Sequence, residues 1–218
     1  MSQTGKKNLV ITSIALYFTY FIHGIGASIM GQYKPELAAH WGAKALSDGT
    51  MDVSMVVSVI AALGLGRLIS LPFSGPLSDK FGRRLSGIIG VICYAAYFMG
   101  IAFAPSMGVA YAFAIVGGIA NSFLDTGIYP AVSEIIYKAP GVATMGIKFF
   151  IAIAQMLLPF VLGVAVTSTA AGLTSYNPLF YGCGIAYIVL FVLVFLFPLP
   201  DADQKAAGKK EGLIDSLK

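Results

Sequence analysis

The ten residues GPLSDKFGRR, Gly75–Arg84, separate two long apolar segments and decide how the chain folds. Two glycines, Gly75 and Gly82, permit a tight reversal of the backbone. Either Ser78 or Asp79 can cap the helix that follows, and Asp79 suits the positive end of its dipole. The basic residues of the stretch are Lys80, Arg83 and Arg84. This pattern predicts a turn on the cytoplasmic face of a membrane, between two spanning helices.

The segments around this turn are too apolar for a soluble domain. Of the 218 residues, 57% are hydrophobic and 11% are charged, and mean hydropathy is +0.82, so the chain has too little polar surface to cover itself. A bilayer core requires roughly 20 apolar residues per helix. Six runs of this length predict helices at residues 9–31, 53–73, 85–104, 107–137, 144–166 and 179–197. We expect an all-α integral membrane bundle over residues 1–200 and a mobile cytoplasmic tail over 201–218.

The net charge of +4 indicates topology, not a nucleic-acid surface. With the N-terminus inside, the inner segments hold ten basic residues and the outer loops hold two, Lys34 and Lys44. The positive-inside rule then places both termini in the cytoplasm, in a multi-pass protein of the cell membrane. Helices one to three and four to six have similar lengths, which predicts two three-helix repeats.

No residue pattern indicates an enzyme. The six predicted helices leave no room for a soluble catalytic domain, and nothing is typical of a nucleophile or a phosphate loop. The two cysteines, Cys93 and Cys183, fall inside apolar helices and have no metal-binding spacing. We therefore expect no cofactor, no metal and no nucleic-acid partner, and the expected surroundings are the lipid bilayer.

The spacing G-x-L-S-D-x-x-G-R-R, in the loop after the second helix, resembles the signature loop of the major facilitator superfamily. The resemblance implies secondary transport of a small solute by alternating access. It also implies that Asp79, Arg83 and Arg84 belong to a charge network that latches two halves of a transporter together. Members of that family usually have twelve helices in two six-helix halves, and this sequence resembles the N-terminal half. A second half is then a separate chain, a copy of this chain in a homodimer, or residues lost by truncation.

A second resemblance concerns NSFLDTGIYPAVSE, Asn121–Glu134. It is similar to the fourth helix of fucose-permease-like sugar transporters, in which a carboxylate followed by a proline lies at the cavity. This implies a sugar-like substrate and proton coupling, with Asp125 at the site. The alternative function is a truncated or split transporter fragment, inactive without a second six-helix chain.

Charged groups inside the membrane cost roughly 2.5–3.5 kcal/mol each on insertion scales, so each needs a partner, water or a function. Asp125 either carries a proton or binds substrate hydroxyls, or it is held in a structural ion pair. Arg67 lies at a similar depth, where it pairs with Asp125, reaches the inner surface, or meets Asp79. A structural bridge between Glu134 and Lys148 is expected near the cytoplasmic surface.

Uncharged polar residues complete the candidate site. Asn121 lies one helical turn before Asp125, on the same face. Tyr20 and His23 share a face of the first helix, and His23 is either a ligand or proton relay, or a histidine satisfied by a neighbouring helix. Gln155 either lines the cavity or joins two helices.

Overall fold

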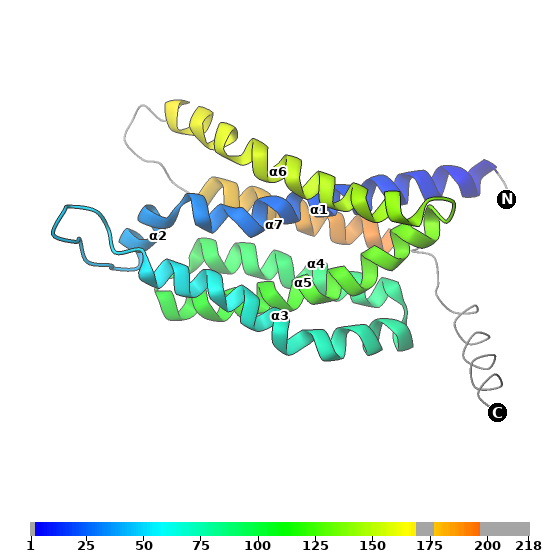
Figure 1. The fold of residues 1–218 in the computed structure, drawn as a ribbon, viewed down its shortest axis with the longest axis horizontal. Coiled ribbons are helices and arrows are strands. Elements are labelled where there is room, and N and C mark those ends of the chain that lie inside the picture. The colour runs from blue at the N-terminus through cyan, green and yellow to red at the C-terminus, as the bar shows by residue number, and fades with distance from the viewer. Residues whose placement is uncertain (1–2, 169–176, 197–218) are drawn as a thin grey trace.

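Every regular element is a helix in the computed structural model, which describes the backbone of residues 3–168 and 177–196 and the side chains of 11–162 and 179–190 (Figure 1). One isolated β-bridge joins Ala45 and Met51. In these ranges the helices are α1 (Gln3–Gln32), α2 (Lys34–His40), α3 (Ser54–Phe81), α4 (Arg83–Phe103), α5 (Met107–Ile135), α6 (Pro140–Ser168) and α7 (Asn177–Leu196). The predicted tail, 201–218, lies outside the described residues.

Six of these helices are long and lie side by side (Figure 1). Five of them, α1 and α3 to α6, are long and apolar enough to cross a membrane, and α7 is an apolar helix of 20 residues. The chain is therefore an all-α protein with the helix set of a membrane bundle. The start of α1, the α3–α4 turn, the α5–α6 turn and the end of α7 all lie at one end of the bundle (Figure 1).

The stretch predicted as an outer loop, residues 32–52, contains the short helix α2. Leu37 and Ala38 are buried against the bundle. Two side chains at its end, His40 and Trp41, approach the carbonyl oxygen of Ala104 at 3.1 and 3.3 Å. This carbonyl is free to accept because α4 ends at Phe103. α2 is thereby tied to the C-terminal end of α4.

The prediction that the helix at 53–73 gives way to a turn at Ser74 was wrong. α3 continues to Phe81, so most of the quoted stretch is helical, and the reversal occurs at Gly82, where φ is +93°. Only a glycine adopts that backbone conformation without strain. Pro72 and Pro76 lie inside α3, which bends along its course in Figure 1. Each proline lacks a backbone donor, which bends the helix without ending it.

The helices pack in the order expected of two three-helix repeats. α3, the middle helix of the first triplet, packs mainly against α5, the first helix of the second. Correspondingly, α6 packs mainly against α1, and the two last helices, α4 and α7, pack against each other. Each of these pairs joins a helix of one triplet to a helix of the other. As a result α1, α3, α5 and α6 surround one region, and α4 and α7 lie on the side away from it.

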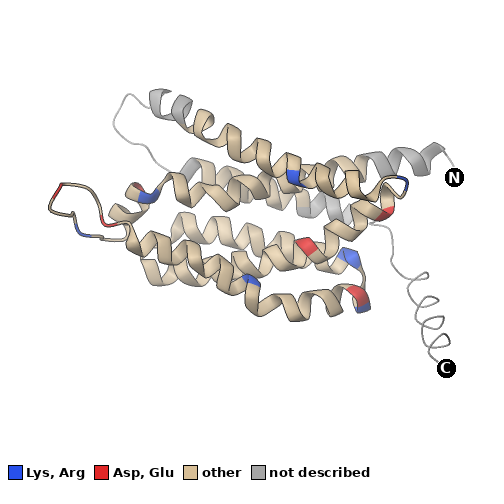
Figure 2. Ribbon diagram, in the orientation of Figure 1, with Lys and Arg blue, Asp and Glu red and all other residues tan. Residues whose placement is uncertain are grey.

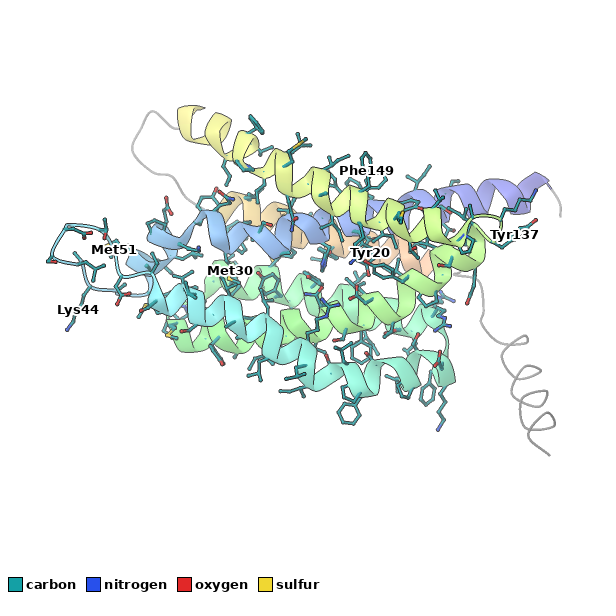
Figure 3. The ribbon with its side chains drawn as sticks, viewed as in Figure 1. Tyr20, Met30, Lys44, Met51, Tyr137 and Phe149 are labelled. Carbon is teal, nitrogen blue, oxygen red and sulfur yellow. The ribbon has the colours of Figure 1, made fainter. Side chains whose placement is uncertain are left out.

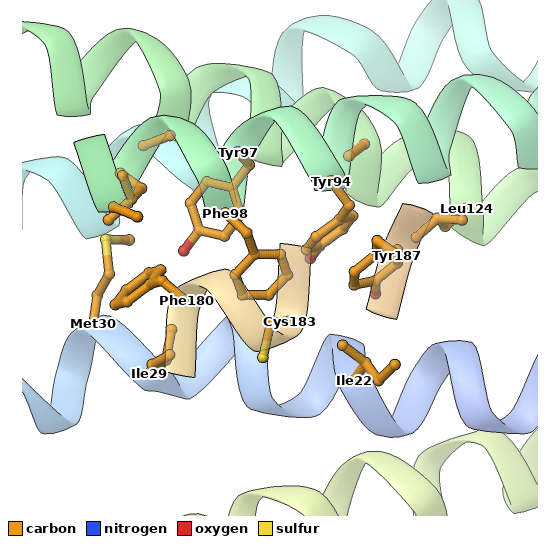
Figure 4. Packing of buried hydrophobic residues seen from close by; sticks show 14 of the residues in the cluster. Ile22, Ile29, Met30, Tyr94, Tyr97, Phe98, Leu124, Phe180, Cys183 and Tyr187 are labelled. Atoms are coloured by element: carbon orange, nitrogen blue, oxygen red, sulfur yellow. The ribbon is translucent and has the colours of Figure 1, made fainter. Parts of the chain in front are cut away.

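Aromatic side chains fill the space between α4 and α7 (Figure 4). The rings of Tyr94 and Tyr187 are stacked with centroids 4.9 Å apart, and Phe98 lies 5.6 Å from Tyr187. Cys183 is buried in this cluster as a free thiol, and Cys93 is a free thiol on α4. Offset aromatic pairs of this kind stabilise a packed interior beyond their apolar area.

The contact between α3 and α5 is close because both helices carry small residues there. A Cβ atom on Gly66 would lie 2.1 Å from the carbonyl oxygen of Ile115, and one on Gly118 would lie 2.1 Å from the carbonyl oxygen of Leu63. Ser70 donates a hydrogen bond of 2.8 Å to Ser122 across the same contact. Small residues allow helix backbones to approach each other in this way.

The outward faces of α3 and α6 are the most exposed of the membrane-length helices. Large apolar side chains project from them: Leu68 on α3 is 69% exposed, and Phe149 on α6, labelled in Figure 3, is 62% exposed. Tyr20, by contrast, is fully buried. Both faces need lipid or another apolar partner.

We predict that Gly118→Ala destabilises the bundle by about 1–3 kcal/mol, because the added methyl group meets backbone that cannot move aside. Thermal unfolding in detergent would measure the loss. Gly64→Ala is the matched control, since nothing lies within 4 Å of a Cβ atom there. Equal melting temperatures for the two variants would contradict the close contact.

Candidate functional site

Charged residues lie mostly near the two ends of the bundle, with few along the helices between (Figure 2). Away from the helix ends, the described spans contain three of them: Arg67 on α3, Asp125 on α5 and Lys148 on α6. The three come from different helices of the group α1, α3, α5 and α6. They define the candidate site.

Arg67 and Asp125 form an ion pair, with Nη2 of Arg67 2.5 Å from Oδ2 of Asp125. The Tyr20 hydroxyl donates a second bond of 2.7 Å to Oδ1 of Asp125. Both carboxylate oxygens thus have a hydrogen-bond donor in this conformation. The Arg67 side chain remains 48% exposed, against 21% for Asp125. Of the three alternatives for Arg67, the structure has the pair with Asp125.

Asn121, Asp125 and Tyr129 follow one another at four-residue intervals on α5, so they share a face. Two buried atoms on this face, Oδ1 of Asn121 and Oη of Tyr129, have no hydrogen-bond partner within the described part of the chain. The sequence analysis identified Asn121 and missed Tyr129, although its spacing from Asp125 was visible. The face therefore offers unpaired polar groups on both sides of the carboxylate.

His23 lies next to Tyr20, the tyrosine that donates to Asp125. Its ring packs against Tyr20 and against Tyr94, with centroids 5.3 Å away in each case. The side chain is buried, and among the described residues Nδ1 has no hydrogen-bond partner. We expected a neighbouring helix to satisfy this histidine. For Nδ1 that expectation is wrong, because Tyr20 and Tyr94 contact the imidazole through their aromatic rings and provide no hydrogen bond to this atom.

The expected bridge between Glu134 and Lys148 was wrong. Lys148 lies eight residues into α6, about 12 Å along the helix from its start at the rise of an α-helix. Its Nζ atom lies 5.1 Å from the centroid of the Tyr129 ring, a cation–π contact. Glu134 is in the last turn of α5 and pairs with Arg83 instead, at 3.7 Å. The two residues are at different depths.

Gln155 lies seven residues after Lys148, on the same face of α6. Its side chain is exposed. It does not join two helices of the described bundle, which removes one of the two alternatives for this residue. The face of α6 that carries Lys148 and Gln155 is polar at two positions in mid-helix.

A second charge cluster lies at the α3–α4 turn and contains the residues of the signature loop. Arg83 pairs with Asp79 at 3.0 Å and with Glu134 at 3.7 Å. The same guanidinium donates to the carbonyl oxygen of Thr126 at 3.5 Å, so it connects α3, α4 and α5. Arg84 is the next residue on α4 and is half-buried. The resemblance named Asp79, Arg83 and Arg84, and the structure adds Glu134.

The fold and these two clusters define a class: a multi-pass helical membrane protein with an ion pair inside the bundle and a charged turn at one end. Residues 16–217 match the Major Facilitator Superfamily. The match covers nearly the whole sequence, and the chain belongs to this family.

Curated relatives agree with this membership. The chain is 39% identical to the inner membrane transport protein YdiM of Escherichia coli strain K12 over 182 residues, and 36% identical to YdiN of the same strain over 191. These alignments cover 79% and 87% of this chain, but only 43% and 41% of the relatives. The chain thus spans less than half the length of both relatives.

A solved structure has the same fold. A partially occluded inward-open structure of the xylose transporter XylE from Escherichia coli aligns with a TM-score of 0.64 over 91% of this chain and 50% of that one. Sequence identity is 19%, so the likeness concerns the fold alone.

We predict that Asp125→Asn lowers the free energy of unfolding by about 1–3 kcal/mol, between the values typical of exposed and buried ion pairs, because Arg67 is left without its counter-charge. The double variant Arg67→Met/Asp125→Asn should recover most of this loss. Unfolding in detergent is measured for the unaltered chain, for Arg67→Met and Asp125→Asn alone, and for the double variant. The four values give the coupling energy between the two side chains. Additive effects of the two single changes would show that the pair contributes nothing.

Proposed function

We propose that this chain forms one six-helix half of a secondary active transporter, which moves a small solute across the cell membrane by alternating access. The observation that carries the proposal is the half-exposed ion pair between Arg67 and Asp125, far from either end of its helices. Charged groups at such depth are costly unless they face water or a partner, and in membrane proteins they mark solute and ion pathways.

The second half of the transporter would cover the exposed faces of α3 and α6. Arg67 lies on the first of these helices, and Lys148 and Gln155 lie on the second. Lipid alone would not solvate these polar groups. A second six-helix bundle closing a water-filled cavity over them accounts for their exposure, whether it is another polypeptide, a second copy of this chain, or part of a longer protein.

The charge cluster at the α3–α4 turn is proposed as the gate. Arg83 connects Asp79 on α3 with Glu134 on α5. Asp79 is exposed by 70%, so it remains available to a group on the second half. Rocking of the two halves would make and break that contact, and Arg84 adds positive charge beside it. We propose that this end of the bundle faces the cytoplasm together with both termini, and the distribution of basic residues along the sequence supports this orientation.

Proton coupling is proposed to involve Asp125, with His23 beside it. In the described conformation Arg67 and Tyr20 occupy both carboxylate oxygens. Movement of Arg67 away from Asp125 during the transport cycle would free one of these oxygens for a proton. A sugar-like solute remains the expectation from the Asn121–Glu134 resemblance, and the geometry of the site adds no support for it, because both oxygens of Asp125 already have donors.

Cysteine crosslinking in native membranes tests the second half directly. In a chain whose native cysteines are replaced by alanine, we expect Leu71→Cys on α3 and Gln155→Cys on α6 to link to peptides of a second six-helix unit. Ile188→Cys, on the exposed face of α7, is the control and should not link. Mass spectrometry of the linked peptides identifies the partner. Unlinked chain from all three positions would favour the alternative, a fragment without transport activity.

Uptake into proteoliposomes under an imposed proton gradient tests the role of Asp125, with a panel of labelled sugars and carboxylates as solutes. We expect Asp125→Asn to make uptake independent of the gradient, because the amide cannot take up a proton. Asp125→Glu should keep the dependence and serves as the control for folding. A normal gradient response in Asp125→Asn would exclude this carboxylate from proton coupling.

A further inference from the structure

We propose that the solute is an organic monocarboxylate, whose carboxylate group binds between Arg67 and Lys148. The inference rests on the proposed transport function and names the substrate class of the same site. It begins from the balance of charge inside the bundle.

The three charged groups of the candidate site do not balance. Arg67 and Lys148 are positive and Asp125 is negative, which leaves one positive charge in excess. Asp125 is already paired with Arg67. Lys148 is exposed, contacts the ring of Tyr129, and makes no ion pair with any described residue. One bound monoanion would neutralise the excess positive charge. This is favourable because an uncompensated charge at this depth is costly.

The donors needed for such an anion are present. The guanidinium of Arg67 has five N–H donors in a planar fork, of which the pair with Asp125 uses one nitrogen, and the side chain is half-exposed. Lys148 brings three further donors. Arginine is suited to carboxylates because its fork matches their geometry. A bound carboxylate would compete with Asp125 for Arg67.

Three buried polar atoms beside the ion pair lack partners among the described residues: Nδ1 of His23, Oδ1 of Asn121 and Oη of Tyr129. His23 is only 8% exposed, so an unpartnered nitrogen there carries the cost of its lost hydration. Buried polar groups are usually satisfied, and these three come from two helices that meet at Asp125. A solute with polar substituents would satisfy them.

Aromatic rings adjoin the charged groups. Tyr20 donates to Asp125 and packs edge-to-face against Tyr129, with ring centroids 5.3 Å apart, and Lys148 lies over the Tyr129 ring. Aromatic rings favour a flat, partly apolar body through stacked or edge contacts. A neutral sugar would leave Lys148 unbalanced. These features together favour a carboxylate on a ring, for which benzoate is the simplest probe.

Binding of benzoate to the chain in lipid nanodiscs tests the proposal. Thermal unfolding is followed by fluorescence of the single tryptophan, Trp41, with benzamide as the neutral compound of the same shape and sodium chloride matched throughout. We expect benzoate, and not benzamide, to raise the melting temperature in a saturable manner. Lys148→Gln should weaken apparent benzoate affinity at least tenfold, and Lys148→Arg should largely restore it. Lys44→Gln, in the outer loop, should bind as the unaltered chain does.

Three results would overturn the proposal: no stabilisation by benzoate, equal stabilisation by benzamide, or undiminished affinity in Lys148→Gln. The last would indicate that a carboxylate of the second half neutralises Lys148 in place of the solute. Failure here leaves the proposed function standing if crosslinking finds the second half and uptake of a neutral solute is observed. Conversely, benzoate binding without any crosslinked partner would contradict the proposed transporter function but would leave the proposed carboxylate site standing.

Discussion

The cost of an unpaired charge inside a membrane is the constraint on which the arrangement of this bundle depends. Arg67 and Asp125 are on different helices, and each would be unstable alone among apolar neighbours. Their contact, extended by the hydroxyl of Tyr20, connects α3, α5 and α1 at one point. Because the guanidinium remains half-exposed, the same contact that stabilises the bundle leaves a charged group available on its open side.

That ion pair requires α3 and α5 to lie close together, and small residues make this possible. Gly66 and Gly118 have no room for a side chain, since a methyl group at either would meet backbone of the opposite helix. Ser70 and Ser122 satisfy each other within the contact. Farther along, Arg83 binds Asp79 and Glu134, so charged groups hold α3 and α5 together at the end of the bundle as well. The close contact between α3 and α5 and the two charge clusters therefore stabilise the same pair of helices.

Local patterns predicted most of the fold but not the ends of its helices or the partners of its charges. Hydrophobic runs of bilayer length indicate α1 and α3 to α7 because the backbone in lipid must be hydrogen-bonded within each segment. The turn after α3 was placed too early, because Gly75 and the polar residues after it suggested a reversal where the helix continues to Phe81. Lys148 was assigned to Glu134 because both were expected near the cytoplasmic surface, whereas Lys148 lies deeper along α6 and contacts Tyr129. Tyr129 itself was missed, although it follows Asp125 by one turn.

The sequence by itself determined the membrane class, the six apolar helices, the basic turn and the presence of costly charges inside the spans, because these follow from composition and spacing along one chain. Only the tertiary structure decided that Asp125 binds Arg67 and Tyr20, that Arg83 takes Glu134, and that Lys148 is left without a counter-ion among the described residues. Apolar runs of bilayer length indicate which segments are helices, but the distance between two side chains on different helices depends on how closely their backbones pack. Here that packing is set by residues as small as Gly66 and Gly118, which carry no charge pattern of their own.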